Sequence, residues 1–147
     1  MEVLELKIIL FNVFMDFIVR QALAQMPEGC GLQVTVRGVA GSCDLPASDS
    51  FHTLVTLLYA DDMVLMAHDP AQLASMLSIM DNVCLRFGRA INAGKTEILL
   101  VDPGRCTPAE MDDVVLSGGT VKSCSAFKYL GGWVDKCGAC TVISVFK

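Results

Sequence analysis

Residues 7–25 carry apolar side chains at spacings of three and four, which predicts an amphipathic helix. Asn12, Asp16 and Arg20 form a polar stripe along the opposite face, where an ion pair between Asp16 and Arg20 is expected. Most of the remaining circumference is apolar as well, so we expect neighbouring structure to cover this helix on most sides. Pro27 and Gly29 are expected to end it. The expected buried face consists of Ile8, Phe11, Met15, Ile18 and Ala22.

Alternating patterns follow the first helix. Residues 32–37 alternate between apolar and polar side chains, which predicts a half-buried strand, and residues 40–50 have the composition of a loop. Two apolar runs, residues 53–59 and 63–67, flank the sequence Ala60-Asp61-Asp62. This arrangement predicts a tight antiparallel hairpin with both aspartates at its turn.

The second helix has clear start and stop signals. Asp69 is expected to cap it, Pro70 to take its first position and Gly88 to end it. Its expected buried face is Leu73, Met76, Leu77, Met80, Cys84 and Phe87.

Short strands complete the expected fold. We expect strands at residues 97–101, 114–116, 120–122 and 127–130, with Ser117-Gly118-Gly119 as the turn of another hairpin and residues 102–110 as a loop. The sum is an α+β domain: an antiparallel sheet with two helices packed on one face.

Composition narrows the class of protein. A chain of 147 residues provides one domain, and its 53% hydrophobic and 18% charged residues exclude disorder as the main state. The net charge of −5 shows no broad basic surface for nucleic acid in the composition. So apolar a chain is expected to expose sizeable apolar patches, which either a protein partner, a second copy or the rest of a larger protein covers.

No membrane or secretion signal is expected. The longest apolar stretch, residues 8–19, is interrupted by Asn12 and Asp16 and is too short for a membrane span. Glu2 and Glu5 stand where a signal peptide would be basic. The chain is therefore expected to be intracellular, in the nucleus or the cytoplasm, with cysteines that are mostly small buried apolar residues.

Asp61 and Asp62 are the first candidates for chemistry. Adjacent carboxylates repel each other, and a divalent cation relieves that repulsion. Mg²⁺ is held in proteins by one or two carboxylates together with water and substrate phosphates. The alternative is a solvated turn, which the dipeptide alone favours. The apolar strands on both sides favour the metal, because they fix the pair rigidly at the edge of a sheet.

The residues around this pair resemble the catalytic motif of reverse transcriptases. The match begins with Tyr59-Ala60-Asp61-Asp62 and continues in family order. Residues 10–15 resemble the helix after the template-positioning motif, residues 91–97 the lysine-bearing segment, and residues 127–131 the primer grip. Lys-Thr-Glu at 95–97 and Phe-Lys-Tyr-Leu-Gly at 127–131 are most similar to the non-LTR, LINE-type retrotransposon branch.

The resemblance implies a fold, a reaction and a site. The fold would be a partial polymerase palm, and the reaction template-directed nucleotidyl transfer on an RNA template and a DNA primer, with two Mg²⁺ ions. Asp61 and Asp62 would be the metal ligands. Lys95 would lie near the incoming triphosphate as the third catalytic residue. The residues implied to hold the primer are Tyr59, Ala60, Tyr129, Leu130 and Gly131.

The chain also departs from the family pattern. The first catalytic aspartate of the family lies upstream of the template-positioning motif, and nothing before residue 8 matches it. We therefore expect a palm truncated at both ends, with residues 1–132 as the partial palm and 133–147 as a C-terminal tail that begins a lost downstream region. With one of three carboxylates missing, Mg²⁺ binding is expected to be weak and the isolated chain inactive.

Two alternatives stay open. The chain is either an enzyme fragment or a non-catalytic interaction module that binds a partner or itself through exposed apolar faces. A third hypothesis is a small metal-binding protein that uses Cys137 and Cys140, whose spacing is that of half a zinc site. No second pair completes that site, since Cys124 is isolated, so two loose thiols are the preferred interpretation. His68 is expected to be structural.

Overall fold

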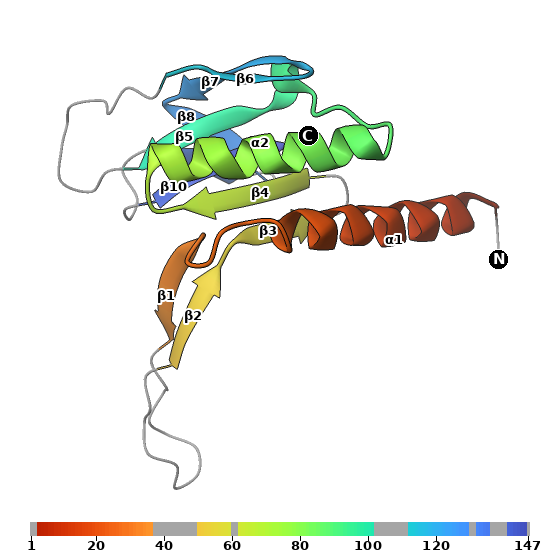
Figure 1. The fold of residues 1–147 in the computed structure, drawn as a ribbon, viewed down its shortest axis with the longest axis horizontal. Coiled ribbons are helices and arrows are strands. Elements are labelled where there is room, and N and C mark those ends of the chain that lie inside the picture. The colour runs from red at the N-terminus through yellow and green to blue at the C-terminus, as the bar shows by residue number, and fades with distance from the viewer. Residues whose placement is uncertain are drawn as a thin grey trace, which may run out of the picture.

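The computed structural model describes residues 3–36, 50–59, 62–101, 112–129, 132–135 and 141–146. Figure 1 shows the arrangement of the helices and strands within these ranges. In chain order they are α1 (Val3–Leu23), β1 (Leu32–Val36), β2 (Ser50–Leu54), β3 (Thr56–Tyr59), β4 (Asp62–Ala67), α2 (Pro70–Arg86), the short 3-10 helix η1 (Ala93–Lys95), β5 (Glu97–Val101), β6 (Val114–Leu116), β7 (Gly119–Cys124), β8 (Ala126–Tyr129), β9 (Gly132–Asp135) and β10 (Thr141–Phe146).

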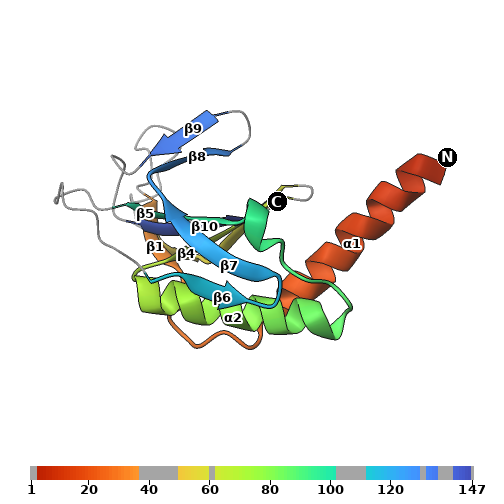
Figure 2. The same cartoon turned by 90° about the horizontal axis from the view of Figure 1, so that it is seen from above.

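The centre of the molecule is a six-stranded sheet with the order β3-β4-β10-β5-β7-β6. Its neighbouring strands are antiparallel except β5 and β7, which are parallel. Helix α2 lies on one face of this sheet and the β8–β9 hairpin on the other (Figure 2). The expected α+β class, with helices on one face of a sheet, is confirmed.

Helix α1 forms as its spacing predicts, and the pair of Arg20 Nε and Asp16 Oδ2 is confirmed at 2.7 Å. The helix ends at Leu23, a turn before Pro27 and Gly29. Only its C-terminal part joins the core, where Ile18 is buried. The expectation that α1 is covered on most sides is wrong for the described residues, because large apolar side chains remain 43–62% exposed at Leu6, Ile8, Ile9, Leu10, Val13 and Phe17.

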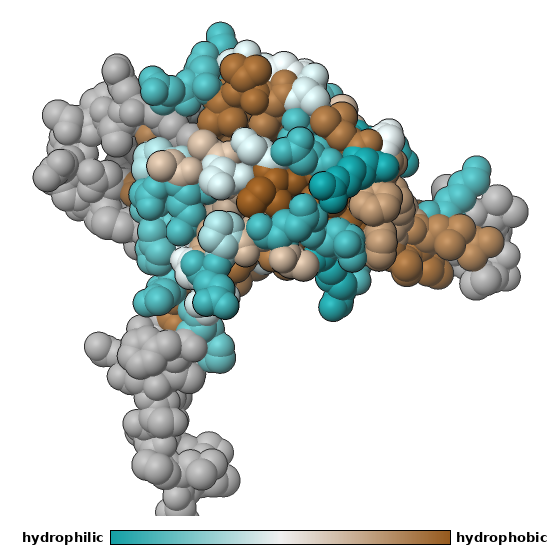
Figure 3. Space-filling model, in the orientation of Figure 1, coloured by the Kyte–Doolittle hydropathy of each residue, from teal (hydrophilic) through white to brown (hydrophobic). Residues whose placement is uncertain are grey.

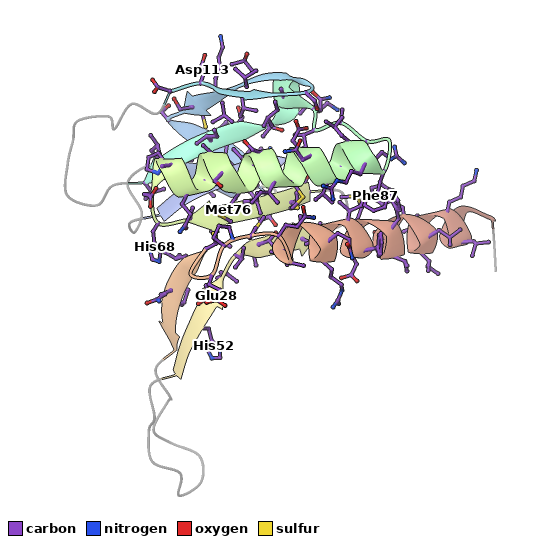
Figure 4. The ribbon with its side chains drawn as sticks, viewed as in Figure 1. Glu28, His52, His68, Met76, Phe87 and Asp113 are labelled. Carbon is purple, nitrogen blue, oxygen red and sulfur yellow. The ribbon has the colours of Figure 1, made fainter. Side chains whose placement is uncertain are left out.

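The surface view shows the same feature. Hydrophobic residues form a continuous surface along α1 where it extends away from the sheet (Figure 3). In its C-terminal half, α1 contacts the C-terminal end of α2 through aromatic rings. Phe87 lies edge-on to Phe17, with 5.3 Å between the ring centroids, and to Phe14 at 6.4 Å (Figure 4). Phe87 remains 38% exposed, so its expected place in the buried face of the second helix is wrong.

The expected strand at residues 53–59 is divided in two. Residues up to Leu54 belong to β2 and pair with β1, whereas β3 begins at Thr56 and pairs with β4. Between them, the carbonyl oxygen of Val55 accepts a hydrogen bond from the N–H of Met66 at 3.0 Å. The chain therefore leaves one hairpin and enters the next without a loop.

Of the described elements, helix α2 agrees most closely with the sequence pattern. The Asp69 side chain accepts a hydrogen bond from the Gln72 N–H at 2.8 Å, which caps the helix in front of Pro70. Its apolar stripe faces the sheet, as Met76 illustrates in Figure 4, and packs in one core cluster with α1 and β4. Gly88 follows the helix with a φ of 69°, a conformation that favours glycine at a helix end.

The C-terminal part contains strands beyond those that the sequence pattern indicated. The hairpin of β6 and β7 and the strand β8 are confirmed. Strand β9 pairs with β8, and β10 lies in the middle of the main sheet. The expected loops at residues 40–50 and 102–110 lie almost wholly outside the described residues. Among the described helices, none is long and apolar enough to cross a membrane.

Candidate functional site

The candidate site is built on the hairpin of β3 and β4. Tyr59 ends β3 and pairs with Asp62, the first residue of β4. Ala60 and Asp61, which connect them, lie outside the described residues. Tyr59 is 63% exposed, whereas Asp62 is half-buried. Apolar strands on both sides of the turn thus fix Asp62 at the end of the sheet, as the sequence predicts.

The alternation of β4 determines which face of the sheet the site occupies. Met63 and Leu65 belong to the core cluster beneath the helices. Val64 and Met66 belong to a second cluster on the opposite face. Because successive side chains of a strand point to opposite faces, Asp62 shares the face of Val64. The paired residue Tyr59 lies on the same face, which the helices leave open.

The β8–β9 hairpin brings a second residue to this face. Phe127 of β8 is buried in the cluster with Val64, and Tyr129 follows it at the end of the strand. Burial raises the pKa of the Tyr129 phenol, and the negative charge of Asp62 raises it further. The fold therefore brings Tyr129 into the electrostatic range of Asp62, although these residues are 67 positions apart.

Strand β5 places Lys95 and Glu97 beside the same end of the sheet. Val145 of β10 pairs with Val64 on one side and Glu97 on the other. Two strand spacings thus separate Val64 from Glu97, or about 10 Å between α carbons. Lys95 ends η1, two residues before the first residue of β5, and is exposed.

Glu97 is a carboxylate that the sequence analysis did not select. It shares the face of Leu99, a member of the same cluster as Val64, and is itself exposed. The charge of Glu97 acts on the thiol of Cys124 on the neighbouring strand. Burial raises the pKa of Cys124, and the negative charge of Glu97 raises it further. The signal in the sequence is the expected strand at 97–101, because the two-residue period of a strand places Glu97, Leu99 and Val101 on one face.

The described residues do not form a metal site by themselves. Within these ranges, no group of three or more histidine, cysteine, aspartate or glutamate side chains is close enough to hold an ion. Asp62 is the one described member of the implied carboxylate pair. The described residues alone therefore do not complete the Mg²⁺ centre that the resemblance implies, since Asp61 lies outside them.

The remaining predicted residues are divided between described and undescribed positions. Leu130 and Gly131 of the implied primer grip, and the thiols Cys137 and Cys140, lie outside the described residues. His68 is exposed directly after β4, and its backbone N–H donates to the Gln72 side chain at 3.2 Å. The described site thus unites Tyr59, Asp62 and Tyr129 on one face, with Lys95 at the same end of the sheet.

One comparison with known proteins identifies a relationship. The model of the family described as reverse transcriptase (RNA-dependent DNA polymerase) matches residues 8–134, most of the chain. No curated protein and no solved structure matches.

Proposed function

Since the chain belongs to the reverse transcriptase (RNA-dependent DNA polymerase) family, we propose that it is a partial palm that does not polymerise DNA by itself. We place its origin in the non-LTR, LINE-type branch, from the Lys-Thr-Glu and Phe-Lys-Tyr-Leu-Gly segments at 95–97 and 127–131. The observation that carries the proposal is the position of Asp62. It begins β4 at a tight hairpin, on the face of the sheet opposite the helices and within electrostatic range of Tyr129.

The proposed roles are those that the resemblance to the family implies. Asp61 and Asp62 are the two carboxylates of the metal site. Tyr59 and Ala60 lie under the end of the DNA primer, and Tyr129, Leu130 and Gly131 hold the primer strand. The exposed Lys95 is available to a triphosphate, because it lies just before β5, at the end of the sheet where β4 begins with Asp62. An RNA template completes the substrate of the full-length ancestor.

The proposed inactivity has a physical basis. Two adjacent carboxylates hold Mg²⁺ weakly, because they supply only two of its ligands and the others remain water. Residues 1–132 would form the partial palm, and residues 133–147 would begin a region beyond it. Polymerisation further needs a third carboxylate, and nothing within residues 1–147 resembles the motif that carries it in the family.

Primer extension tests the proposed inactivity. The protein is incubated with a primed RNA template, deoxynucleotides and Mg²⁺ or Mn²⁺, and the Asp61→Ala variant serves as the control. We expect neither the unaltered chain nor the Asp61→Ala variant to extend the primer in a template-dependent way. Extension that the unaltered chain performs and Asp61→Ala abolishes would show an active polymerase and refute the proposal.

A metal titration tests the site itself. Mn²⁺ broadens the amide signals of nearby residues in NMR spectra, so it reports weak binding as well as location. We expect broadening at millimolar Mn²⁺ around residues 59–63, and its loss in the double variant Asp61→Asn/Asp62→Asn. The exposed pair Asp112 and Asp113 is a matched control, because it consists of the same two residues outside the hairpin. Equal broadening around both pairs would contradict a dedicated site.

The exposed face of α1 supports a second candidate function. Leu10 is 58% exposed and Val13 is 62% exposed, on a helix whose C-terminal part alone is buried in the core. A non-catalytic module that associates with itself through this face would cover them. We expect its size in sedimentation to increase with concentration, and Leu10→Glu/Val13→Glu to remain monomeric. A chain that is monomeric at all concentrations would remove this candidate.

A further inference from the structure

Helix α1 carries two apolar stripes that point in different directions. Ile18, Val19 and Ala22 form the first stripe, which is buried in the core of the protein. Because successive residues advance by about 100° around an α-helix, the second stripe lies on roughly the opposite side. This outer stripe is exposed and consists of Leu6, Leu10, Val13 and Phe17.

The spacing of the outer stripe is that of a coiled-coil seam. Its members are separated by four, three and four residues, which is the pattern by which two helices pack along each other. A helix that is apolar on several sides is normally covered on those sides. Within the described residues only the first stripe is buried. The outer stripe therefore has the form of a contact with another helix.

The aromatic residues at the base of α1 widen the outer stripe at one end. Phe87, the residue after α2, lies edge-on to Phe17 with 5.3 Å between the ring centroids and is itself 38% exposed. At the other end, Leu6 lies in the N-terminal half of α1, which extends away from the sheet (Figure 1, Figure 2). The stripe thus has a broad end near the sheet and a narrow end away from it.

The outer stripe is complementary to itself when a second copy is reversed. A two-fold axis at the middle of the stripe places Leu6 against the partner's Phe17, and Leu10 against the partner's Val13. All four residues then have an apolar neighbour, and the narrow end of each stripe meets the broad end of the other. A parallel pair would instead crowd Phe17 and Phe87 of both copies at one level.

The area of such a contact agrees with a weak but specific dimer. The outer stripe and Phe87 together expose on the order of 500 Å² of apolar surface per chain, so a pair would bury on the order of 1,000 Å². Specific protein interfaces begin at about this area, and the smallest of them belong to reversible complexes. The stripe is about 17 Å long, which leaves the two domains at opposite ends of the helix pair.

We propose that α1 binds α1 of a second copy of this chain in an antiparallel pair, through the outer stripe. The occupant is a second copy because the reversed stripe matches both the spacing and the taper of the original. The proposal rests on the second candidate function, self-association through α1, and gives that association its geometry. Self-association and its geometry are tested separately.

Isotope-filtered NMR tests the geometry in the unaltered chain. A labelled copy is mixed with an unlabelled copy, so that only contacts between copies are observed. We expect contacts of the Leu6 methyl groups with the partner's Phe17 ring, and of Leu10 with the partner's Val13. Contacts of Leu6 with the partner's Leu6, or contacts confined to other surfaces, would overturn the antiparallel pair but not self-association. A chain that sediments as a monomer at all concentrations would overturn both.

Two double variants test the same pairing by charge. In Leu10→Glu/Val13→Lys, an antiparallel pair brings the new carboxylate of each chain to the new ammonium group of the other, whereas a parallel pair brings like charges together. In Leu10→Glu/Val13→Glu, like charges meet in both geometries. Both variants bury less apolar surface than the unaltered chain and should dimerise more weakly. We expect the dissociation constant of the first variant to be at least about tenfold below that of the second in sedimentation experiments.

Val115 on β6 provides the control for these variants. It is 76% exposed at the far edge of the sheet, so Val115→Glu should leave the dissociation constant of the dimer unchanged. Loss of the dimer in Val115→Glu would place the contact at β6 and overturn the proposal. Equal dissociation constants for the two double variants would overturn the antiparallel pair. Where a variant unfolds, the NMR contacts of the unaltered chain decide.

Discussion

Asp81 of α2 holds Ser117 at the turn between β6 and β7 through both of its carboxylate oxygens. Oδ2 accepts a hydrogen bond from the Ser117 N–H and Oδ1 accepts one from the Ser117 hydroxyl, each at 2.7 Å. Asp81 is only 6% exposed, so these bonds are partly shielded from water. The contact joins residues 36 positions apart and ties the far edge of the sheet to the helix behind it.

Removal of this carboxylate is expected to destabilise the fold. Asp81→Ala leaves two donors of Ser117 without their partner, and a loss of about 2–3 kcal/mol in the free energy of unfolding is expected, measured by urea denaturation. Asp81→Asn keeps one acceptor oxygen and should lose less. The exposed Asp113, which is labelled in Figure 4, provides the control, since Asp113→Ala should change the free energy of unfolding by no more than about 0.5 kcal/mol. Equal effects at both positions would contradict a structural role for Asp81.

The cap of α2 gives a smaller, local prediction. Asp69→Ala removes the acceptor of the Gln72 N–H, and its cost is expected to be about 1 kcal/mol. Asp69→Ser preserves a capping oxygen and should recover most of the stability. Chemical denaturation measures both variants. If serine destabilised the protein as much as alanine, the hydrogen bond would not be the cause.

Gly118 marks a place where two segments approach too closely for a side chain. A Cβ atom there would overlap the carbonyl oxygen of Ile91 in the segment before η1. We expect Gly118→Ala to cost about 1–3 kcal/mol, because the turn or the preceding segment must shift. Gly94→Ala is the matched control, since its nearest neighbour, Asn92 Oδ1, would lie 3.4 Å away. A lower thermal midpoint for the Gly94 variant than for the Gly118 variant would contradict this packing.

The proximity of Asp62 and Tyr129 is testable by titration. In a Tyr59→Phe background, Tyr129 is the sole tyrosine, so the ultraviolet absorbance of the phenolate reports its pKa directly. Burial and the Asp62 charge raise that pKa above the ordinary value of about 10. Asp62→Asn is expected to lower it, and Asp113→Asn to leave it unchanged. If Asp62→Asn left the pKa of Tyr129 unchanged, the charge of Asp62 would not act on this phenol.

The same shift predicts how stability depends on pH. A raised pKa means that the folded protein holds the phenol proton more tightly than the unfolded chain does. The corresponding stabilisation is complete below the ordinary tyrosine pKa and is lost as pH rises through the higher folded value. Unfolding experiments across this alkaline range should show a shallower loss for Asp62→Asn than for Asp113→Asn.

Local patterns were sufficient wherever neighbouring residues determine the structure. The Asp69-Pro70 start of α2 and its apolar stripe follow from capping and helical periodicity, and the hairpin at Tyr59 and Asp62 follows from two apolar runs around a short turn. The family order of the segments at 59–62, 91–97 and 127–131 was likewise readable, because it is a property of the chain alone.

The tertiary structure decided what depends on partners distant in sequence. Periodicity makes α1 a helix, but it does not say how much of its apolar surface finds a neighbour, and Val13 stays exposed. An apolar run such as 141–146 does not state which strand it pairs with, and only the packed sheet places it between β4 and β5. The electrostatic effect of Asp62 on Tyr129 also depends on residues distant in sequence. The sequence of a strand determines which of its side chains share a face, but only the whole fold determines which face another hairpin covers.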